Sequence, residues 1–287
     1  MASTWSAPNL KSRPIAIIGG GVLGRRLCMM WACTGYEILL VDQSAAVVKD
    51  ALAYVEENIE AQIAKVGGKR GSVRAAASLE EACRDAWQVI EVIPERLELK
   101  IPIMGTLDQI TRPDCIIATN SSSYKSSEMI ERVKGTYRVL NTHYFMPPMA
   151  VAVELMTCGH TDPAVIEFMK VQTAAVGFTP VHAKVESTGF VMNRIWAAMK
   201  REALLEMSQG VATPEDIDLL FKSLFGSKVG ICQMMDEVGL DTVYNIEKHY
   251  VEERKIDPTP MNWLKSTYLD KGFLGNKSGQ GLLTQKE

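Results

Sequence analysis

The chain has 287 residues, of which 47% are hydrophobic and 23% are charged, and its 31 basic and 34 acidic side chains leave a net charge of −3. This composition is ordinary for a soluble globular protein, and the length allows two domains. Without a basic surplus the chain cannot neutralise many phosphates, so we expect no nucleic-acid partner. No apolar run approaches the ~18 residues of a membrane span, so we expect no membrane partner either.

The six cysteines, at positions 28, 33, 83, 115, 158 and 232, are scattered along the chain. They form no C-x-x-C pair and no cluster with histidine, so the sequence predicts no metal site. We interpret them as reduced, mostly buried thiols, and we therefore expect a cytoplasmic protein.

Strand-like and helix-like segments alternate through the first two thirds of the chain. Short apolar runs predict strands at 15–18, 37–41, 73–76, 89–93, 115–118, 138–141, 151–155 and 180–183. Helical patterns lie between them at 22–34 and 45–65, after a capping box formed by Ser78 and Glu81, and at 165–175 behind Asp162. This alternation predicts an α/β fold with a Rossmann-type, doubly wound sheet.

The strand signal stops near residue 187. An apolar stripe at helical spacing runs over 189–208, Thr213 and Pro214 open another helix, and further helices are expected at 231–237, 241–252 and 259–269. We therefore predict an α/β domain over residues 1–186 and an all-helical domain over residues 187–287.

A glycine-rich hexapeptide follows the first strand. Gly19, Gly21 and Gly24 form G-x-G-x-x-G, and the intervening Val22 and Leu23 begin a helix. The first glycine permits a tight turn, the second lets the backbone approach a pyrophosphate, and the third lets helix and strand pack closely. The helix N-terminus then offers N–H groups to the phosphates.

The acidic residue that this fingerprint requires stands about 20 residues further on, after the second strand. Asp42 can accept hydrogen bonds from both ribose hydroxyls, and its charge repels a 2′-phosphate, so NAD is favoured over NADP. The adjacent Gln43 adds no cation, although Arg25 and Arg26 leave NADP open. The alternative interpretation is a plain strand–turn–helix with an acidic cap.

Of the four histidines, one ends a strand that leads into two prolines. His143 is expected at the carboxyl end of the sheet, where open α/β sheets bind ligands. Glu154 lies within an apolar strand 11 residues later, where a carboxylate is costly unless it is paired. An imidazole is a natural partner, so the two residues are candidates for a base and its orienting acid. A structural histidine at a strand end remains the alternative.

Taken together, these motifs resemble the L-3-hydroxyacyl-CoA dehydrogenase family over nearly the whole chain. Besides the glycine motif and Asp42, the resemblance is carried by the segments 89–95 (VIEVIPE) with Lys100, 119–123 (TNSSS), 143–148 (HYFMPP) followed by Glu154, 189–194 (GFVMNR), 238–241 (VGLD) and 275–281 (GNKSGQG). The order and spacing of these segments make the match specific.

The resemblance implies NAD as the cofactor and a role for each matching residue. His143 would be the catalytic base, Glu154 its partner, Ser122 a hydrogen-bond donor to the reacting oxygen, and Asn193 a substrate contact from the second domain. The cofactor contacts would be Gly19, Gly21, Val22, Leu23, Gly24, Asp42, Gln43, Glu95, Lys100 and Asn120. It also implies a homodimer formed through the helical domain.

Simpler interpretations of these residues stay open at this point. Residues 121–123 can be an ordinary polar loop, Asn193 a solvent-facing helix residue, and Glu95 with Lys100 a surface pair of little energetic value.

The chain departs from the family where the substrate would bind. Members that use coenzyme A have a long lysine-rich arm after the second strand, whereas here the segment 60–77 is short and carries only Lys65, Lys69, Arg70 and Arg74. These cations can bind CoA phosphates or form a solvated turn.

Three hypotheses about function follow. The protein is a dehydrogenase of a CoA-linked or carrier-linked 3-hydroxyacyl substrate, a dehydrogenase of a free 3-hydroxy acid such as gulonate, or a redox-silent protein like the lens crystallin of this family.

Overall fold

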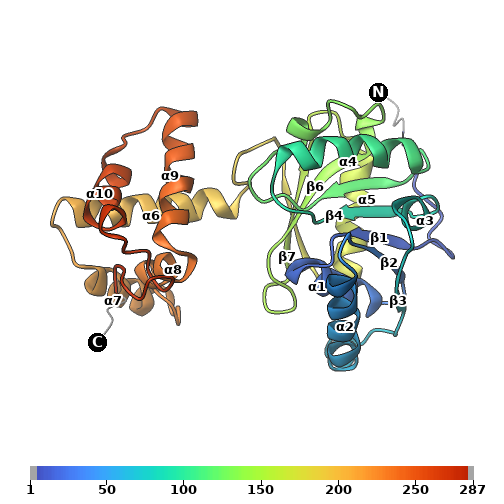
Figure 1. Ribbon diagram of the computed structural model, residues 1–287, viewed down its shortest axis with the longest axis horizontal. Coiled ribbons are helices and arrows are strands. Elements are labelled where there is room, and N and C mark those ends of the chain that lie inside the picture. The colour runs from blue at the N-terminus through green and yellow to red at the C-terminus, as the bar shows by residue number, and fades with distance from the viewer. Residues whose placement is uncertain (1–4, 284–287) are drawn as a thin grey trace. The chain divides into compact units, whose positions relative to one another are not determined.

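The computed structural model describes residues 5–283, and its internal contacts divide the chain after Val191 into two compact units (Figure 1). The first unit is built on one eight-stranded sheet with the order β3-β2-β1-β4-β5-β6-β7-β8. The strands are β1 (Ile15–Ile18), β2 (Glu37–Val41), β3 (Ser72–Ala75), β4 (Gln88–Glu91), β5 (Ile116–Thr119), β6 (Val139–Tyr144), β7 (Ala152–Thr157) and β8 (Thr179–Ala183). The predicted α/β class is confirmed.

The six neighbouring strands β3-β2-β1-β4-β5-β6 pair in parallel. The chain adds β2 and β3 on one side of β1 and then crosses to the other side, where it adds β4, β5 and β6, so the order of the strands switches between β1 and β4. In sheets of this kind such a switch point leaves a crevice at the carboxyl ends of the strands, where ligands bind. The glycine motif directly follows β1 and therefore lies at this edge.

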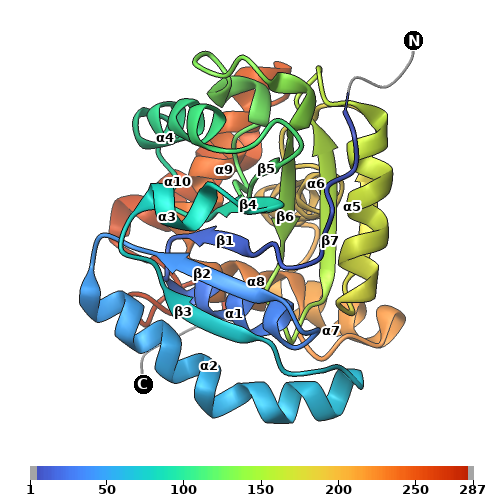
Figure 2. The same ribbon diagram turned by 90° about the vertical axis from the view of Figure 1, so that its right-hand side faces the viewer.

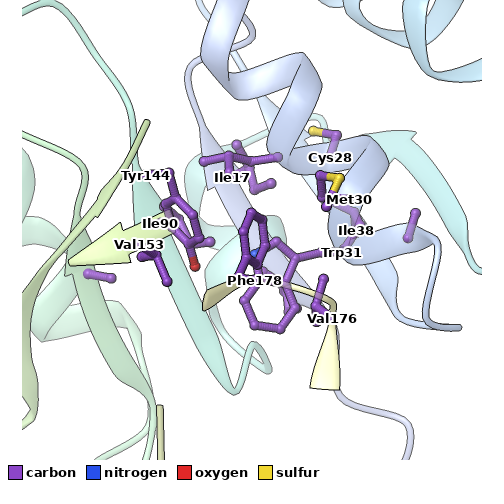
Figure 3. Packing of buried hydrophobic residues seen from close by; sticks show 14 of the residues in the cluster. Ile17, Cys28, Met30, Trp31, Ile38, Ile90, Tyr144, Val153, Val176 and Phe178 are labelled. Atoms are coloured by element: carbon purple, nitrogen blue, oxygen red, sulfur yellow. The ribbon is translucent and has the colours of Figure 1, made fainter. Parts of the chain in front are cut away.

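Helices cover both faces of the sheet (Figure 2). Because side chains alternate along β1, Ile15 and Ile17 face one cluster and Ala16 and Ile18 the other. The first cluster is covered by α1 (Val22–Ala32), α2 (Ala45–Val66) and α5 (Pro163–Ala175), the second by α3 (Leu79–Cys83) and α4 (Leu97–Ile110). In the first cluster the rings of Trp31, Tyr144 and Phe178 pack together (Figure 3).

Strand β7 runs antiparallel to β6, because only residues 145–151 connect the two strands. An antiparallel pair places the residues that face each other across the ladder on the same side of the sheet. In this register His143 lies directly opposite Glu154.

The second unit consists of the helices α6 (Met192–Ser208), α7 (Pro214–Phe225), α8 (Ile231–Val238), α9 (Leu240–Arg254) and α10 (Thr259–Thr267). They enclose a separate core that includes Leu204, Met235 and Leu264. The buried Asp236 accepts hydrogen bonds from the N–H groups of Leu282 and Leu283, so the glycine-rich segment 275–281 wraps around this carboxylate. Within residues 5–283 no helix is both long and apolar enough to cross a membrane.

Two helices differ from the sequence prediction. Helix α4 was not predicted, because Pro102 lies inside it and proline normally interrupts a helix. The helix predicted to start at residue 189 starts instead at Met192, since Gly189 and Phe190 have positive φ angles of 75° and 53°. A right-handed helix cannot continue through such residues.

Three sequence signals for helix starts can be compared with the structure. Asp162 and Thr213 cap α5 and α7 as expected, and Ser78 accepts from the N–H of Glu81 at 3.1 Å. The reciprocal bond of the capping box is displaced by one residue, because Glu81 accepts from the N–H of Ala77.

Candidate active site

The three glycines of the motif have three different surroundings. Gly19 has φ of 110°, and a Cβ atom there would lie 2.6 Å from the carbonyl oxygen of Val92. A Cβ on Gly24 would lie 1.9 Å from the carbonyl oxygen of Gly19, so only glycine lets α1 approach this turn. A Cβ on Gly21 would meet nothing within 4 Å. The open space at Gly21 is where a phosphate can approach the backbone.

Helix α1 begins at Val22 without a side-chain cap, and Val22 is exposed while Leu23 is half-buried. Its N-terminus is therefore open to an anion. Asp42 accepts hydrogen bonds from the N–H groups of Gly20 at 2.8 Å and Ser44 at 2.9 Å, which fix the carboxylate beside the glycine turn. Gln43 is exposed next to it. This cradle fits the pyrophosphate and ribose of a dinucleotide.

The two arginines of α1 are engaged within the protein. Arg25 lies 4.7 Å from the ring centroid of Tyr54, and Arg26 donates a hydrogen bond to the carbonyl oxygen of Pro147 at 2.9 Å. Cation–π contact and hydrogen bonding thus direct both guanidinium groups toward α2 and the loop after β6.

The imidazole of His143 is paired with a carboxylate. Its Nδ1 lies 2.9 Å from Oε2 of Glu154, and the two residues are only 6% and 2% exposed. The other carboxylate oxygen, Oε1, accepts from the N–H of Val191 at 3.0 Å. The rings of Phe145 and Phe190 lie 4.7 Å and 4.9 Å from the imidazole. Because Nδ1 faces the acid, Nε2 is the ring nitrogen that a proton-transfer role would use.

A second buried ion pair lies at the carboxyl end of β4. Lys100 Nζ is 2.7 Å from Glu91 Oε1 and 3.3 Å from Glu95 Oε2. Glu91 Oε2 accepts from the hydroxyl of Thr119 at 2.6 Å. Lys100 is 1% exposed, so the interpretation of Glu95 and Lys100 as a surface pair is wrong. Sequence reasoning missed Glu91, although a carboxylate inside the apolar run 89–93 is the same signal that indicated Glu154.

The loop after β5 is held by this network. Glu95 Oε1 accepts from the hydroxyl of Ser121 at 2.6 Å and from the N–H groups of Ser122 at 3.1 Å and Ser123 at 2.9 Å. Ser122 itself is exposed. Asn120 Oδ1 accepts from the N–H of Tyr144 at 2.8 Å, so this loop is also tied to the end of the His143 strand.

Asn193, the remaining candidate, lies in the first turn of α6 and so belongs to the helical unit. The structure thus brings His143 together with Glu154, and Lys100 together with Glu95. It places Ser122 and Asn120 on one loop, and Gly19, Gly21, Gly24 and Asp42 in one cradle.

The short segment after α2 has its arginines paired with carboxylates. Arg70 binds Glu56 and Glu60, and Arg74 binds Glu37 and Glu81. The hydrogen bonds that both guanidinium groups donate to these carboxylates raise the pKa of Arg70 and Arg74. Both cations are therefore already matched by acidic partners.

A dinucleotide cradle at the switch point of a parallel sheet, with a histidine–carboxylate pair at the same edge, defines a nicotinamide-dependent dehydrogenase. Residues 14–186 match the model of the 3-hydroxyacyl-CoA dehydrogenase NAD-binding domain, and residues 189–285 match that of its C-terminal domain. The chain belongs to the 3-hydroxyacyl-CoA dehydrogenase family, and it is an NAD-dependent oxidoreductase.

Individual relatives agree with this membership. Hydroxyacyl-coenzyme A dehydrogenase, mitochondrial, of Homo sapiens is 28% identical over 304 residues, covering 98% of this chain and 94% of the relative. The 3-hydroxyacyl-CoA dehydrogenase-like protein LAM1 of Cochliobolus heterostrophus is 43% identical over 146 residues, which are 50% of this chain and 31% of that protein. A solved diketoreductase that acts on dicarbonyl compounds is 28% identical, with a TM-score of 0.79 over 94% of this chain and 98% of that one.

Proposed function

We propose that this enzyme interconverts an L-3-hydroxyacyl substrate, linked to CoA or to a carrier, and its 3-keto form, with His143 as the general base. The observation that carries the proposal is the contact of 2.9 Å between His143 Nδ1 and the buried Glu154. The carboxylate orients the ring and stabilises the imidazolium that forms when the ring accepts a proton.

The residues of the chain divide the work as follows. His143 Nε2 takes the proton of the 3-hydroxyl, the Ser122 hydroxyl donates a hydrogen bond to the same oxygen, and Asn193 is a further substrate contact. Bound NAD would supply the acceptor for the hydride that leaves C3. Glu95, Lys100 and Asn120 would lie around the ribose and nicotinamide of the cofactor, with the buried Lys100 acting through its contact with Glu95. Gly19, Gly21, Val22, Leu23, Gly24, Asp42 and Gln43 would hold the phosphates and the adenosine ribose.

The test is the change in NADH absorbance on mixing the protein with acetoacetyl-CoA and NADH. Consumption of NADH by the wild type, and its loss in His143→Gln, supports the proposal. Absence of consumption with acyl chains of several lengths, despite tight NADH binding, contradicts it.

A free 3-hydroxy acid is the second candidate substrate, and one observation favours it. Arg70 and Arg74 are both matched by carboxylates, which leaves the segment after α2 with few free cations for CoA phosphates. The likeness to a diketoreductase points the same way. Reduction of NAD with gulonate, together with no heat of binding when CoA is titrated into the protein, would favour the free acid over the thioester.

We assign cofactor binding to residues 1–186, and substrate binding and dimerisation to residues 187–287. Helix α7 supports the dimer, because it presents four exposed apolar side chains, Leu219, Leu220, Leu224 and Phe225, which are 61% to 78% exposed. Exposed apolar surface of this kind marks protein contacts. Leu224→Asp should convert the dimer to a monomer in analytical ultracentrifugation, whereas Val185→Asp, an equally exposed position on the first unit, should not.

We also place the protein in the cytoplasm. All six cysteines are free and buried, which suits a reducing compartment. Imaging of the tagged protein in cells of its source organism tests this assignment, and accumulation in mitochondria would contradict it.

A further inference from the structure

The segment Gly189–Val191, here called the strap, has an unusual backbone. Gly189 and Phe190 have consecutive positive φ angles of 75° and 53°. Glycine adopts this region freely, but a bulky aromatic residue rarely does, because its Cβ crowds the following carbonyl group. Strained residues of this kind persist only where their surroundings hold them, and they gather at functional sites.

The surroundings of Phe190 account for its persistence. Its N–H donates to the carbonyl oxygen of Ser187 at 3.0 Å, and its own carbonyl oxygen accepts from the Ser187 hydroxyl at 3.2 Å. Its side chain is 2% exposed and packs with Met156 and Ala183. Two hydrogen bonds between Ser187 and Phe190 therefore close the turn, and the buried Phe190 ring holds it against the protein.

Both members of the histidine–carboxylate pair are held by the strap. The Phe190 ring stacks on the His143 imidazole with centroids 4.9 Å apart and an angle of 29° between the planes. The N–H of Val191 donates to Glu154 Oε1 at 3.0 Å, while Oε2 of the same carboxylate binds the imidazole. Two adjacent residues of the chain thus fix the base and its acid at once.

We propose that Phe190 is a positioning residue that holds the His143 ring in its reactive orientation. The bond to Glu154 fixes the direction of one ring nitrogen, but rotation about the Cβ–Cγ bond of histidine is soft. Stacking by Phe190, together with the contact of the tilted Phe145 ring at 4.7 Å, restricts that rotation. Helix α6, with Asn193, begins immediately after the strap. The inference rests on the proposed role of His143 and adds a residue outside the reacting set.

The experiment compares Phe190→Leu, which removes the ring, with Phe190→Tyr, which keeps it. We expect kcat to fall about 10- to 100-fold in the leucine variant, since small misplacements of a catalytic group are costly, and to stay within about fivefold in the tyrosine variant. The KM for NAD should change less than about threefold in both. The downfield proton resonance of the Nδ1–H bound to Glu154 should weaken or broaden in Phe190→Leu and persist in Phe190→Tyr.

Phe168→Leu is the matched control, because the Phe168 ring packs on Trp5 and Trp87 and makes no ring contact with His143. It should lose stability yet keep kcat. If Phe190→Leu does not fold, Phe190→Met is measured by the same criteria.

The inference is overturned if Phe190→Leu keeps wild-type kcat, or if it loses activity while the Nδ1–H resonance is unchanged. A wild type that is inactive on every 3-hydroxy substrate overturns the proposed function instead. In that case the resonance in Phe190→Leu still decides whether the strap orients the ring.

Discussion

Lys100 Nζ lies 2.7 Å from Glu91 Oε1, and the two side chains are 1% and 0% exposed. A buried pair of opposite charges is tolerated because each charge offsets the desolvation of the other, and removing one partner leaves the second without compensation. The pair also reaches Glu95, whose other oxygen holds the loop of Ser122. A buried ion pair between β4 and α4 is therefore connected to a candidate substrate contact.

Lys100→Met should lower the free energy of unfolding by about 3–5 kcal/mol, because it leaves the Glu91 carboxylate buried and unpaired. Urea unfolding monitored by tryptophan fluorescence measures the change. The double variant Glu91→Gln, Lys100→Met should recover part of the loss. A single variant as stable as the wild type would show that Glu91 is neutral in the folded protein.

His143→Ala should lower kcat by about 10²–10⁴-fold, the usual contribution of a general base. The affinity for NADH, measured by fluorescence titration, should stay near the wild-type value, because the base acts on the chemical step. A large loss of NADH binding together with normal turnover at saturation would remove His143 from catalysis.

Two glycine substitutions should separate folding from cofactor binding. Gly24→Ala should abolish or strongly reduce stability, since its Cβ would lie 1.9 Å from the Gly19 carbonyl oxygen. Gly21→Ala should keep the wild-type melting temperature, because nothing lies within 4 Å of the added Cβ, but it should weaken NAD binding at least tenfold. Calorimetry for melting and binding tests both, and normal NAD affinity in Gly21→Ala would move the pyrophosphate elsewhere.

Asp42→Ala should weaken NAD binding and reduce the preference for NAD over NADP. The carboxylate is fixed by the N–H groups of Gly20 and Ser44, so it would meet the ribose in a defined position and would repel a 2′-phosphate there. Dissociation constants for both dinucleotides measure the effect, with Asp50→Ala on the outer part of α2 as the control. An unchanged ratio of the two constants would take Asp42 away from the ribose.

Lys200 in α6 gives a prediction about pH. Burial lowers the pKa of its ammonium group from 10.5 to about 8, while the charge of Glu247 acts in the opposite direction. Because the folded-state pKa lies below the unfolded one, the folded protein binds fewer protons between about pH 8 and 10.5, and stability from this group rises with pH through that window.

Lys200→Met should therefore be more stable than the wild type at pH 7, by about 1–3 kcal/mol, and the gain should shrink as the pH approaches 10. Urea unfolding at several pH values measures the difference, and Lys248→Met, which removes an exposed lysine of α9, controls for net charge. An equal gain at all pH values would contradict the role of the buried ammonium group.

Part of the geometry of the candidate site was predicted from short segments of sequence. The glycine motif with Asp42 predicted the cradle, because each glycine answers a local steric requirement that does not depend on the rest of the fold. The pairing of His143 with Glu154 was also predicted, from the cost of a carboxylate in an apolar strand. The contact between these two residues is confirmed.

Other features escaped prediction for physical reasons. Helix α4 was not predicted because it contains Pro102. The unfavourable free energy of proline inside a helix is outweighed here by packing of the helix against the sheet. The true start of α6 was hidden because an apolar pattern over 189–191 fits a helix equally well. Only the positive φ angles of Gly189 and Phe190 separate the strap from the helix. Glycine adopts such an angle freely, but phenylalanine rarely does, so Phe190 gave no signal of the break.

The sequence by itself determined the alternation of strands and helices, the glycine turn and the pairing of His143 with Glu154. Each of these depends on side-chain periodicity, on steric demands within a few residues, or on the cost of burying a charge. The tertiary structure alone decided that Glu91 meets Lys100, that Arg70 and Arg74 are matched by acids, and that Phe190 stacks on His143. These contacts depend on how separate elements pack against one another, and no pattern within a single segment of the chain predicts them.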